Sequence, residues 1–176
     1  MRVATFVAIF VGLLGVNPAA ASPLVQAAGC SGSTTAAAPP ASELASMHCL
    51  VNSVRAQHGL AALREMPALD RSSGLRAQAI LRCGDFSHTP CGQSFVQPFV
   101  RVGYLRGSSS VGENLAWGGG TLGSPGATFD SWLRSPDHRA NLLKPAWRDF
   151  GVALQRGSFF GNANVSLWVL QFGRRS

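Results

Sequence analysis

Two histidines and one glutamate are the residues of this sequence that point most directly to chemistry. They are His88, Glu113 and His138, each in a separate polar segment that we expect to be a loop at a helix end. Two His and one Glu form the ligand set of some catalytic zinc sites, and a histidine near neutral pH can also move a proton. Because no His-Glu-x-x-His motif occurs, spacing alone gives no geometry. The alternative is three polar residues making local hydrogen bonds.

Two serines beside these histidines suggest a second chemistry. Ser87 directly precedes His88, and Ser135 lies shortly before His138. A serine nucleophile with a histidine base and Glu113 as the orienting acid would make a hydrolase, and a metal-bound water is another route to hydrolysis. However, the chain has no Gly-x-Ser-x-Gly motif, and a serine at a helix end usually caps the helix. Hydrolysis therefore stays an alternative.

Hydrophobic periodicity predicts the elements that must position these residues. Helical spacing predicts a first helix over 44–58, a second over 69–81, a weak third over 94–102, a fourth from Ser124-Pro125 to Arg134 and a helical turn over 140–143. Alternation predicts strands over 149–155 and 166–172, with a hairpin loop over 157–164. The three glycines at 118–120 predict a loop. Because the helices come first and the hairpin last, we expect an α+β fold.

The N-terminus has the features of a secretory signal peptide. A single Arg precedes the uncharged stretch 3–16, which is shorter than the roughly 20 residues that span a bilayer, and small residues follow at 19–21. We expect a signal peptide over 1–21, a flexible Ala/Ser/Pro-rich arm over 22–42 and one folded domain over 43–176. A secreted, extracytoplasmic protein without a membrane span after cleavage follows. An uncleaved anchor and a lipid attached to Cys30 are the alternatives.

The cysteine count favours disulfide bonds. The chain has four cysteines, and an even number in an exported protein is typical of disulfides. Four cysteines allow three pairings. A Cys83–Cys91 bridge would close a short loop and hold His88, and a Cys30–Cys49 bridge would then tie the N-terminal arm to the first helix. The alternative is a Cys/His metal site, which the absence of a Cys-x-x-Cys motif disfavours.

The charge of the chain is positive but scattered. The formal net charge is +7 and the pI is about 10.6. A strongly basic protein suggests nucleic acid as a partner, but here no basic stripe is interleaved with aromatic residues. We therefore expect no nucleic-acid partner and attribute the charge to life near an anionic cell envelope.

Several short motifs follow one another along the chain in a characteristic order. They are Leu50-Val51-Asn52, His58-Gly59-Leu60, Phe86-Ser87-His88, Gly112-Glu113-Asn114-Leu115-Ala116, Trp132 to Asn141, Phe150-Gly151-Val152 and Trp168 to Gly173. In this order they resemble the CAP superfamily (cysteine-rich secretory proteins, antigen 5 and pathogenesis-related 1), in its bacterial SCP-domain branch. The resemblance covers residues 43–172. It implies a three-layer α-β-α sandwich with a small antiparallel sheet between helices, in which the stretch near Leu115 also forms a strand.

The resemblance also implies a central cleft in which two His and two Glu face one another and can hold a divalent cation, Zn or Ca. His88 matches the first His, Glu113 the first Glu and His138 the second His. The second Glu is expected three residues after Trp132, where this chain has Ser135. Because Ser135 is neutral, it weakens the attraction for a cation, and calcium in particular prefers more oxygen ligands. Asn114 and Ser135 complete the residues that we expect in the cleft.

Three functions are compatible with these features. The first is a monomeric, noncatalytic extracellular protein whose cleft binds an extracellular or envelope-derived ligand, either lipid-like or protein, and can also hold a divalent cation. The resemblance supports it because no general enzymatic activity defines the family. The second is a hydrolase that uses His138 and Glu113 with Ser135 or a metal-bound water. The third is a structural cell-envelope protein in which the same polar groups only stabilise the fold.

Overall fold

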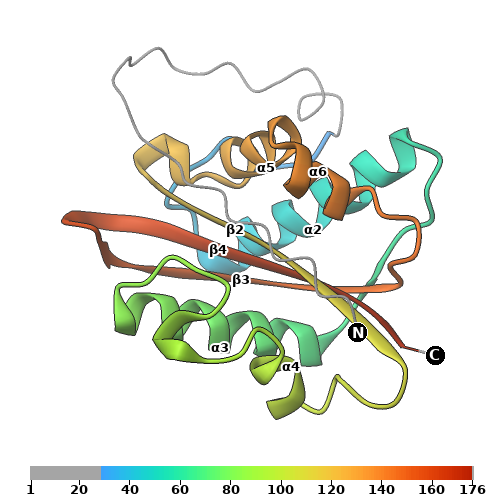
Figure 1. The fold of residues 1–176 in the computed structure, drawn as a ribbon. Helices are drawn as coiled ribbons and strands as arrows, with labels where there is room; N and C mark the ends of the chain where they lie inside the picture. The colour runs from blue at the N-terminus through green and yellow to red at the C-terminus, as the bar shows by residue number, and fades with distance from the viewer. Residues whose placement is uncertain (1–28, 176) are drawn as a thin grey trace.

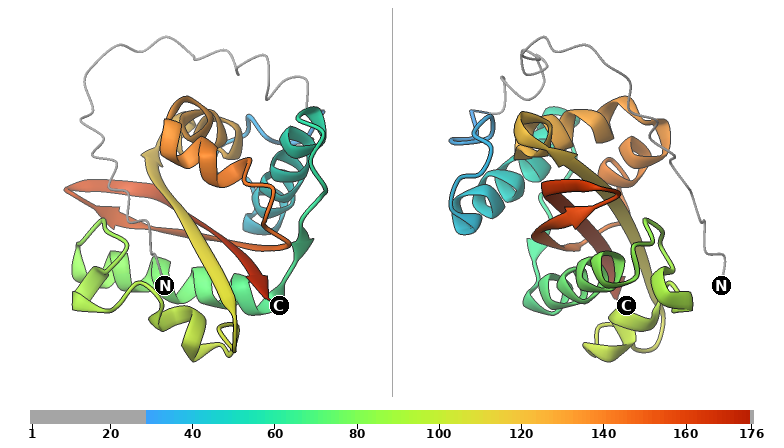
Figure 2. Two further views of the ribbon diagram at one scale, coloured as in Figure 1. Left: turned by 45° about the vertical axis from the view of Figure 1, so that its right-hand side comes forward. Right: turned by 90° about the vertical axis from the view of Figure 1, so that its left-hand side faces the viewer.

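Helices cover both faces of a small β-sheet in the computed structural model of the protein, which describes residues 29–175 (Figure 1). Helices α2, α5 and α6 lie on one face and α3 and α4 on the other, as the rotated views also show (Figure 2). The elements are α2 (Pro40–Gln57), β1 (Arg64–Glu65), α3 (Pro67–Cys83), η1 (Pro90–Gly92), α4 (Gln97–Arg101), β2 (Ser109–Gly119), η2 (Gly120–Gly123), α5 (Pro125–Arg134), α6 (Pro136–Leu142), β3 (Asp149–Phe159) and β4 (Asn162–Arg175). The expected three-layer α-β-α sandwich is confirmed.

The sheet has the strand order β1-β3-β4-β2 in the described part of the chain. β3 and β4 form the expected antiparallel hairpin, β2 pairs antiparallel with β4, and the two-residue strand β1 adds a short parallel edge beside β3. The predicted hairpin loop over 157–164 is too long, since the strands continue to Phe159 and resume at Asn162. The loop predicted at 118–120 is also wrong for its first two glycines, because Gly118 and Gly119 pair with β4 as the end of β2.

Side chains of β4 alternate between two hydrophobic cores, one on each face of the sheet. Leu167 and Val169 pack against α3, whereas Trp168 and Leu170 pack against α2 and α5. This is the alternation that the sequence predicts for a strand buried on both faces. All four side chains are fully buried. Burying one such side chain stabilises the fold by roughly 1.5–3 kcal/mol, so β4 is the element that holds both helical layers together.

The helix ends follow local sequence signals. Ser124 caps α5 by accepting a hydrogen bond from the backbone N–H of Ala127, and Pro125 occupies the first helical position. α3 ends at Gly84, whose left-handed φ of 61° is the conformation that favours glycine after a helix. α6 begins at Pro136, four residues earlier than the predicted turn at 140–143. A proline at the first helical position explains this earlier start, because its fixed φ suits the helix.

Disulfide bonds join Cys30 to Cys49 and Cys83 to Cys91, which is the pairing expected from the sequence. α2 begins at Pro40, and the segment before it contacts the folded domain: Ser33 is buried, and its carbonyl accepts a hydrogen bond from the backbone of Gly126. The predicted signal peptide and residues 22–28 of the predicted arm lie outside the described residues. Across residues 29–175, none of the helices has the length and apolarity to cross a membrane.

Candidate functional site

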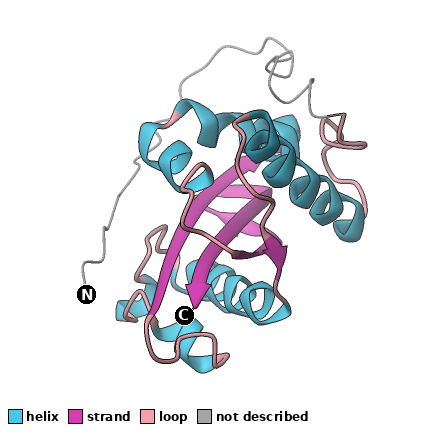
Figure 3. Ribbon diagram, turned by 90° about the vertical axis from the view of Figure 1, so that its right-hand side faces the viewer, coloured by secondary structure: helices cyan, strands magenta, loops and turns pink. Residues whose placement is uncertain are grey.

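Strand β2 forms one edge of the sheet, which lies between the two helical layers (Figure 3). The segment after α3 carries His88 from one layer, and α6 carries His138 from the other. Glu113 lies on β2 itself. The prediction that all three lie in loops is therefore wrong for two of them, because Glu113 is in a strand and His138 is in a helix. Three segments that are distant in sequence thus meet at one sheet edge.

Glu113 has its carboxylate at the centre of a buried hydrogen-bond cluster. Its Oε1 accepts from Nδ1 of His88 at 2.8 Å, and its Oε2 accepts from Nε of Arg76 at 3.1 Å and from Nε2 of Gln171 at 2.7 Å. Gln171 is the residue opposite Glu113 in the β2–β4 register. The Glu113 side chain is 0% exposed. A buried carboxylate requires this kind of compensation, because transferring an unpaired charge out of water is very unfavourable.

Arg76 is the main functional residue that the sequence reasoning missed. Its side chain is 0% exposed, and besides the ion pair with Glu113 its Nη2 donates to the backbone carbonyl of Phe95 at 2.6 Å. The signal was present in the sequence, because Arg76 lies one helical turn before Ile80 and one turn after Ser72 on the buried side of α3. An arginine on that side needs a buried acid as its partner. Gln171 was missed for the same reason, as a polar residue in an otherwise apolar strand.

His88 and His138 differ in their hydrogen-bond partners. Because an ionised carboxylate only accepts hydrogen bonds, Nδ1 of His88 carries the proton that Glu113 binds. Burial and, to a smaller extent, the nearby His88 lower the pKa of His138 to about 4, against the opposing effect of Asp137. His138 is therefore a neutral imidazole near pH 7. Its ring is half-buried, and within residues 29–175 it has no hydrogen-bond partner.

Asn114 lies at the site, where its side chain joins β2 to α6. Its Nδ2 donates to the backbone carbonyl of His138, and its Oδ1 accepts from Nδ2 of Asn141. Asn141 also donates to the backbone carbonyl of Glu113, and Nε1 of Trp132 donates to that of Leu115. These bonds attach α5 and α6 to the outer edge of β2. They fix the backbone of His138 relative to Glu113.

Gly112 permits a further anchor of the same region. A Cβ at this position would lie 2.8 Å from the Trp147 ring, so only a glycine lets the indole pack on the strand. Nε1 of Trp147 in turn donates to the backbone carbonyl of Asn141. The glycine, the tryptophan and the asparagine therefore act together to position α6.

The candidate nucleophiles are not joined to the histidines. Oγ of Ser87 donates to Asp85 and accepts from the backbone of Thr89, which makes it part of a local turn. Ser135 precedes α6, and its side chain makes no hydrogen bond with any residue in the described range. The His88–Glu113 pair has the form of a base with its orienting acid, but neither serine completes it.

The residues at this edge do not fit a resident divalent cation. No group of three or more His, Cys, Asp or Glu is placed to hold one metal ion in the part of the chain that the structure describes. Both oxygens of Glu113 already accept bonds, and one of them pairs with a guanidinium. His88 and His138 alone would be one short of the three protein ligands of a catalytic zinc site. The predicted zinc or calcium site therefore has no support in this geometry.

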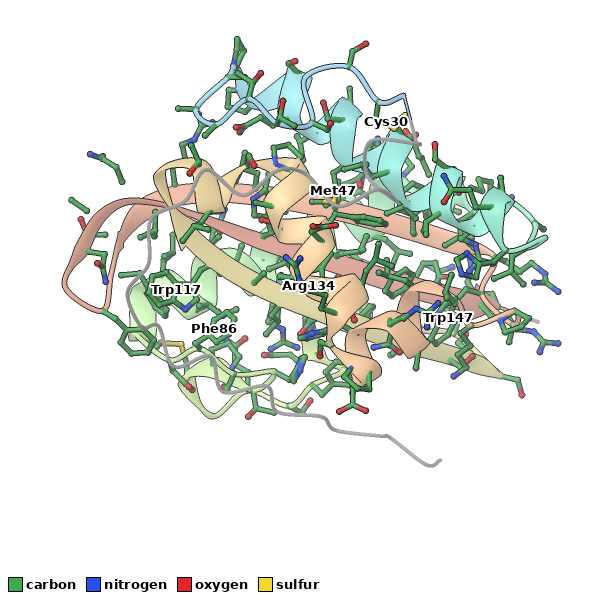
Figure 4. All side chains as sticks on the ribbon, turned by 90° about the horizontal axis from the view of Figure 1, so that it is seen from above. Cys30, Met47, Phe86, Trp117, Arg134 and Trp147 are labelled. Carbon is green, nitrogen blue, oxygen red and sulfur yellow. A yellow bond between two sulfur atoms is a disulfide. The ribbon has the colours of Figure 1, made fainter. Side chains whose placement is uncertain are left out.

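An aromatic cluster continues from the polar site along the same face of β2. Successive side chains of a strand point to opposite faces, so residues 113, 115 and 117 share one face of β2. Leu115 and Trp117 therefore follow Glu113 toward the turn of the β3–β4 hairpin. Trp117 packs with Phe86 and Phe159 in the core beneath α3, and Phe160 at the turn is 61% exposed. Figure 4 shows Phe86 and Trp117 at one end of the sheet, far from Trp147.

Comparison with known proteins agrees with this architecture. Residues 49–172 match the model of the cysteine-rich secretory protein family, CAP, and the chain therefore belongs to this family. The resemblance in the order of its motifs is thereby confirmed. Among curated proteins, no sequence matches the chain.

Several solved bacterial structures share the fold. An extracellular protein of Bacillus anthracis that contains an SCP domain has 19% identity and a TM-score of 0.61, with 80% of this chain and 45% of that protein covered. An outer surface protein of Borrelia burgdorferi has 21% identity and a TM-score of 0.60, with 74% and 90% covered. A cysteine-rich secretory protein of Staphylococcus aureus has 15% identity and a TM-score of 0.59, with 80% and 40% covered. The chain thus spans less than half of the Bacillus and Staphylococcus proteins.

Proposed function

We propose that the protein is a noncatalytic extracellular binding protein whose ligand contacts His138 and His88 at the β2 edge. The observation that carries the proposal is the His138 ring. It is half-buried, neutral near pH 7 and without a hydrogen-bond partner in the described range. A neutral imidazole offers one donor and one acceptor, and a partly enclosed group with both free is suited to a polar part of a ligand.

The aromatic cluster indicates what the rest of such a ligand would be. Trp117 and Phe86 are half-buried, Phe160 is exposed, and the chain has no charged residue between Arg156 and Arg174. A ligand that contacts the histidines and extends along β2 would meet an apolar, uncharged surface. We therefore propose an amphipathic ligand, lipid-like or a protein segment, with a hydrogen-bonding end at the histidines.

The family and the solved structures support an extracellular location. The Bacillus protein is described as extracellular and the Borrelia protein as an outer surface protein. Together with the predicted signal peptide and the two disulfides, these descriptions favour secretion or display at the cell envelope for this chain. Hydrolysis is less supported, because a histidine with a pKa near 4 is a weak base at neutral pH.

The test is native mass spectrometry of the full protein purified from the culture medium of its own host. We expect the wild-type protein to carry an additional small-molecule or peptide mass, and His138→Ala to lose most of it. His58→Ala is the matched control, because His58 is an exposed histidine at the end of α2. A wild-type protein that is folded but carries no ligand would favour the structural envelope role instead.

A further inference from the structure

The buried guanidinium of Arg76 changes what the His and Glu residues of this site can bind. We propose that Arg76 is the resident cation of the site: it takes beside Glu113 the electrostatic place of a divalent metal ion, so that the native protein binds ligands there without metal. Arg76 was not among the residues that the sequence motifs singled out. The inference comes from its contacts.

The ion pair is fully enclosed. Both side chains are 0% exposed, and Nε of Arg76 lies 3.1 Å from Oε2 of Glu113. Arginine stays charged at every ordinary pH, and a buried pair of opposite charges is screened little by salt. Glu113 therefore always has a positive partner, and the pair adds no net negative charge to the site.

Three donors already occupy three of the roughly four acceptor positions of the Glu113 carboxylate. His88 donates to one oxygen, and Gln171 shares the other oxygen with Arg76. A metal ion bound to Glu113 would have to share Oε1 with His88 or displace one of these donors. It would also lie beside the guanidinium, where two positive charges repel each other strongly because little water separates them.

Two buried atoms next to the carboxylate have no protein partner in the described residues. They are Nη1 of Arg76, a donor, and Oε1 of Gln171, an acceptor. One donor and one acceptor match a water molecule or a neutral hydrogen-bonding group. A cation bound to the Gln171 oxygen would lie close to the positive guanidinium, because both side chains bond to the same Glu113 oxygen, so a neutral occupant is favoured.

Ser135 agrees with this interpretation. The family pattern expects a second carboxylate at this position, and a second carboxylate would give the site an unbalanced negative charge. With Ser135 in its place, one glutamate and one arginine balance each other, and His138 is neutral near pH 7. The negative charge of Glu113 is thus neutralised without a metal ion.

The test measures Zn²⁺ binding by isothermal titration calorimetry, together with NMR signals of the histidine rings. We expect that wild-type protein has no saturable Zn²⁺ site that depends on His138. Any weak Zn²⁺ binding by wild type should therefore be the same in His138→Ala. Arg76→Gln should bind one Zn²⁺ at least tenfold more tightly than wild type, with shifts in the His88 and His138 signals. Arg76→Lys should behave like wild type because it keeps the charge. Arg71→Gln, an exposed arginine of the same helix, is the control.

Two results would overturn the proposal. One is stoichiometric Zn²⁺ binding by wild-type protein that weakens at least tenfold in His138→Ala. The other is a folded Arg76→Gln variant with no gain in Zn²⁺ affinity. If Arg76→Gln does not fold alone, it is refolded in excess Zn²⁺: recovery of the fold supports the proposal, and failure contradicts it. This proposal is independent of the proposed ligand binding. The Zn²⁺ titration tests only the role of Arg76, whereas the co-purification experiment tests only whether a ligand is bound, so either can fail without the other.

Discussion

Acidification should destabilise the protein through His138, and the structure gives the size of the effect. The folded state holds this ring neutral with a pKa of about 4, whereas a histidine in the unfolded chain has a pKa of about 6.5. Between these two values the unfolded state binds more protons than the folded state. Stability is therefore fully present above pH 6.5 and falls as the pH is lowered toward 4.

The magnitude follows from the difference between the two pKa values. That difference, 6.5 minus about 4, multiplied by roughly 1.4 kcal/mol per pKa unit, gives a full loss of about 3–4 kcal/mol in the free energy of unfolding below both pKa values. At pH 5 the loss would be about 2 kcal/mol. This is a large part of the total stability of a domain of this size, which is typically about 5–15 kcal/mol.

Urea unfolding of wild type and of His138→Gln at several pH values between 7 and 4 measures the effect. Other groups also titrate in this range: burial raises the pKa of Asp70, and that acts in the opposite direction. Comparing the two proteins cancels such contributions. We expect the wild-type curve to fall more steeply with acid by about 2 kcal/mol at pH 5. Equal slopes for the two proteins, or an NMR midpoint near 6.5 for His138, would refute the reasoning.

Three further predictions concern the structure around the site. Arg76→Met should lower the free energy of unfolding by about 3–5 kcal/mol in urea denaturation, since it leaves a buried carboxylate without its ion partner; a change below about 1 kcal/mol would contradict the buried pair. Gly112→Ala should destabilise by about 1–3 kcal/mol because its Cβ would press on Trp147, and a neutral result in thermal unfolding would show that the indole can move. Replacing Cys83 and Cys91 together by Ser should lower stability by about 2–3 kcal/mol and speed amide hydrogen exchange over residues 84–90, and unchanged exchange would mean that the bridge does not hold this loop.

The fold could be predicted from the sequence to the extent that its signals are local. Alternation in β4, the Ser124-Pro125 start of α5 and Gly84 at the end of α3 each follow from the conformational preferences of a few residues. Strand β2 could not be found in this way. Its pairing with β4 decides its conformation, and this long-range pairing overrides the tendency of Gly118 and Gly119 to form a loop.

The site shows the same division. The motifs identified His88, Glu113 and His138, and the structure brings them to one strand edge. What they can bind depends on Arg76 and Gln171, which belong to no motif and reach Glu113 only through the packing of α3 and β4 on β2. The motif residues therefore indicated where the site lies. What the site can bind is decided by Arg76 and Gln171, which are distant from Glu113 in the sequence.

The hydrogen bonds on the outer side of β2 also affect whether the sheet can pair with another molecule. An edge strand with unpaired carbonyls is a template on which a strand of another molecule can add. Here Asn141 and Trp132 already occupy the carbonyls of Glu113 and Leu115, so an incoming strand would have to break both bonds and displace two helices. The side chains that position the histidines thereby also protect the sheet against aggregation.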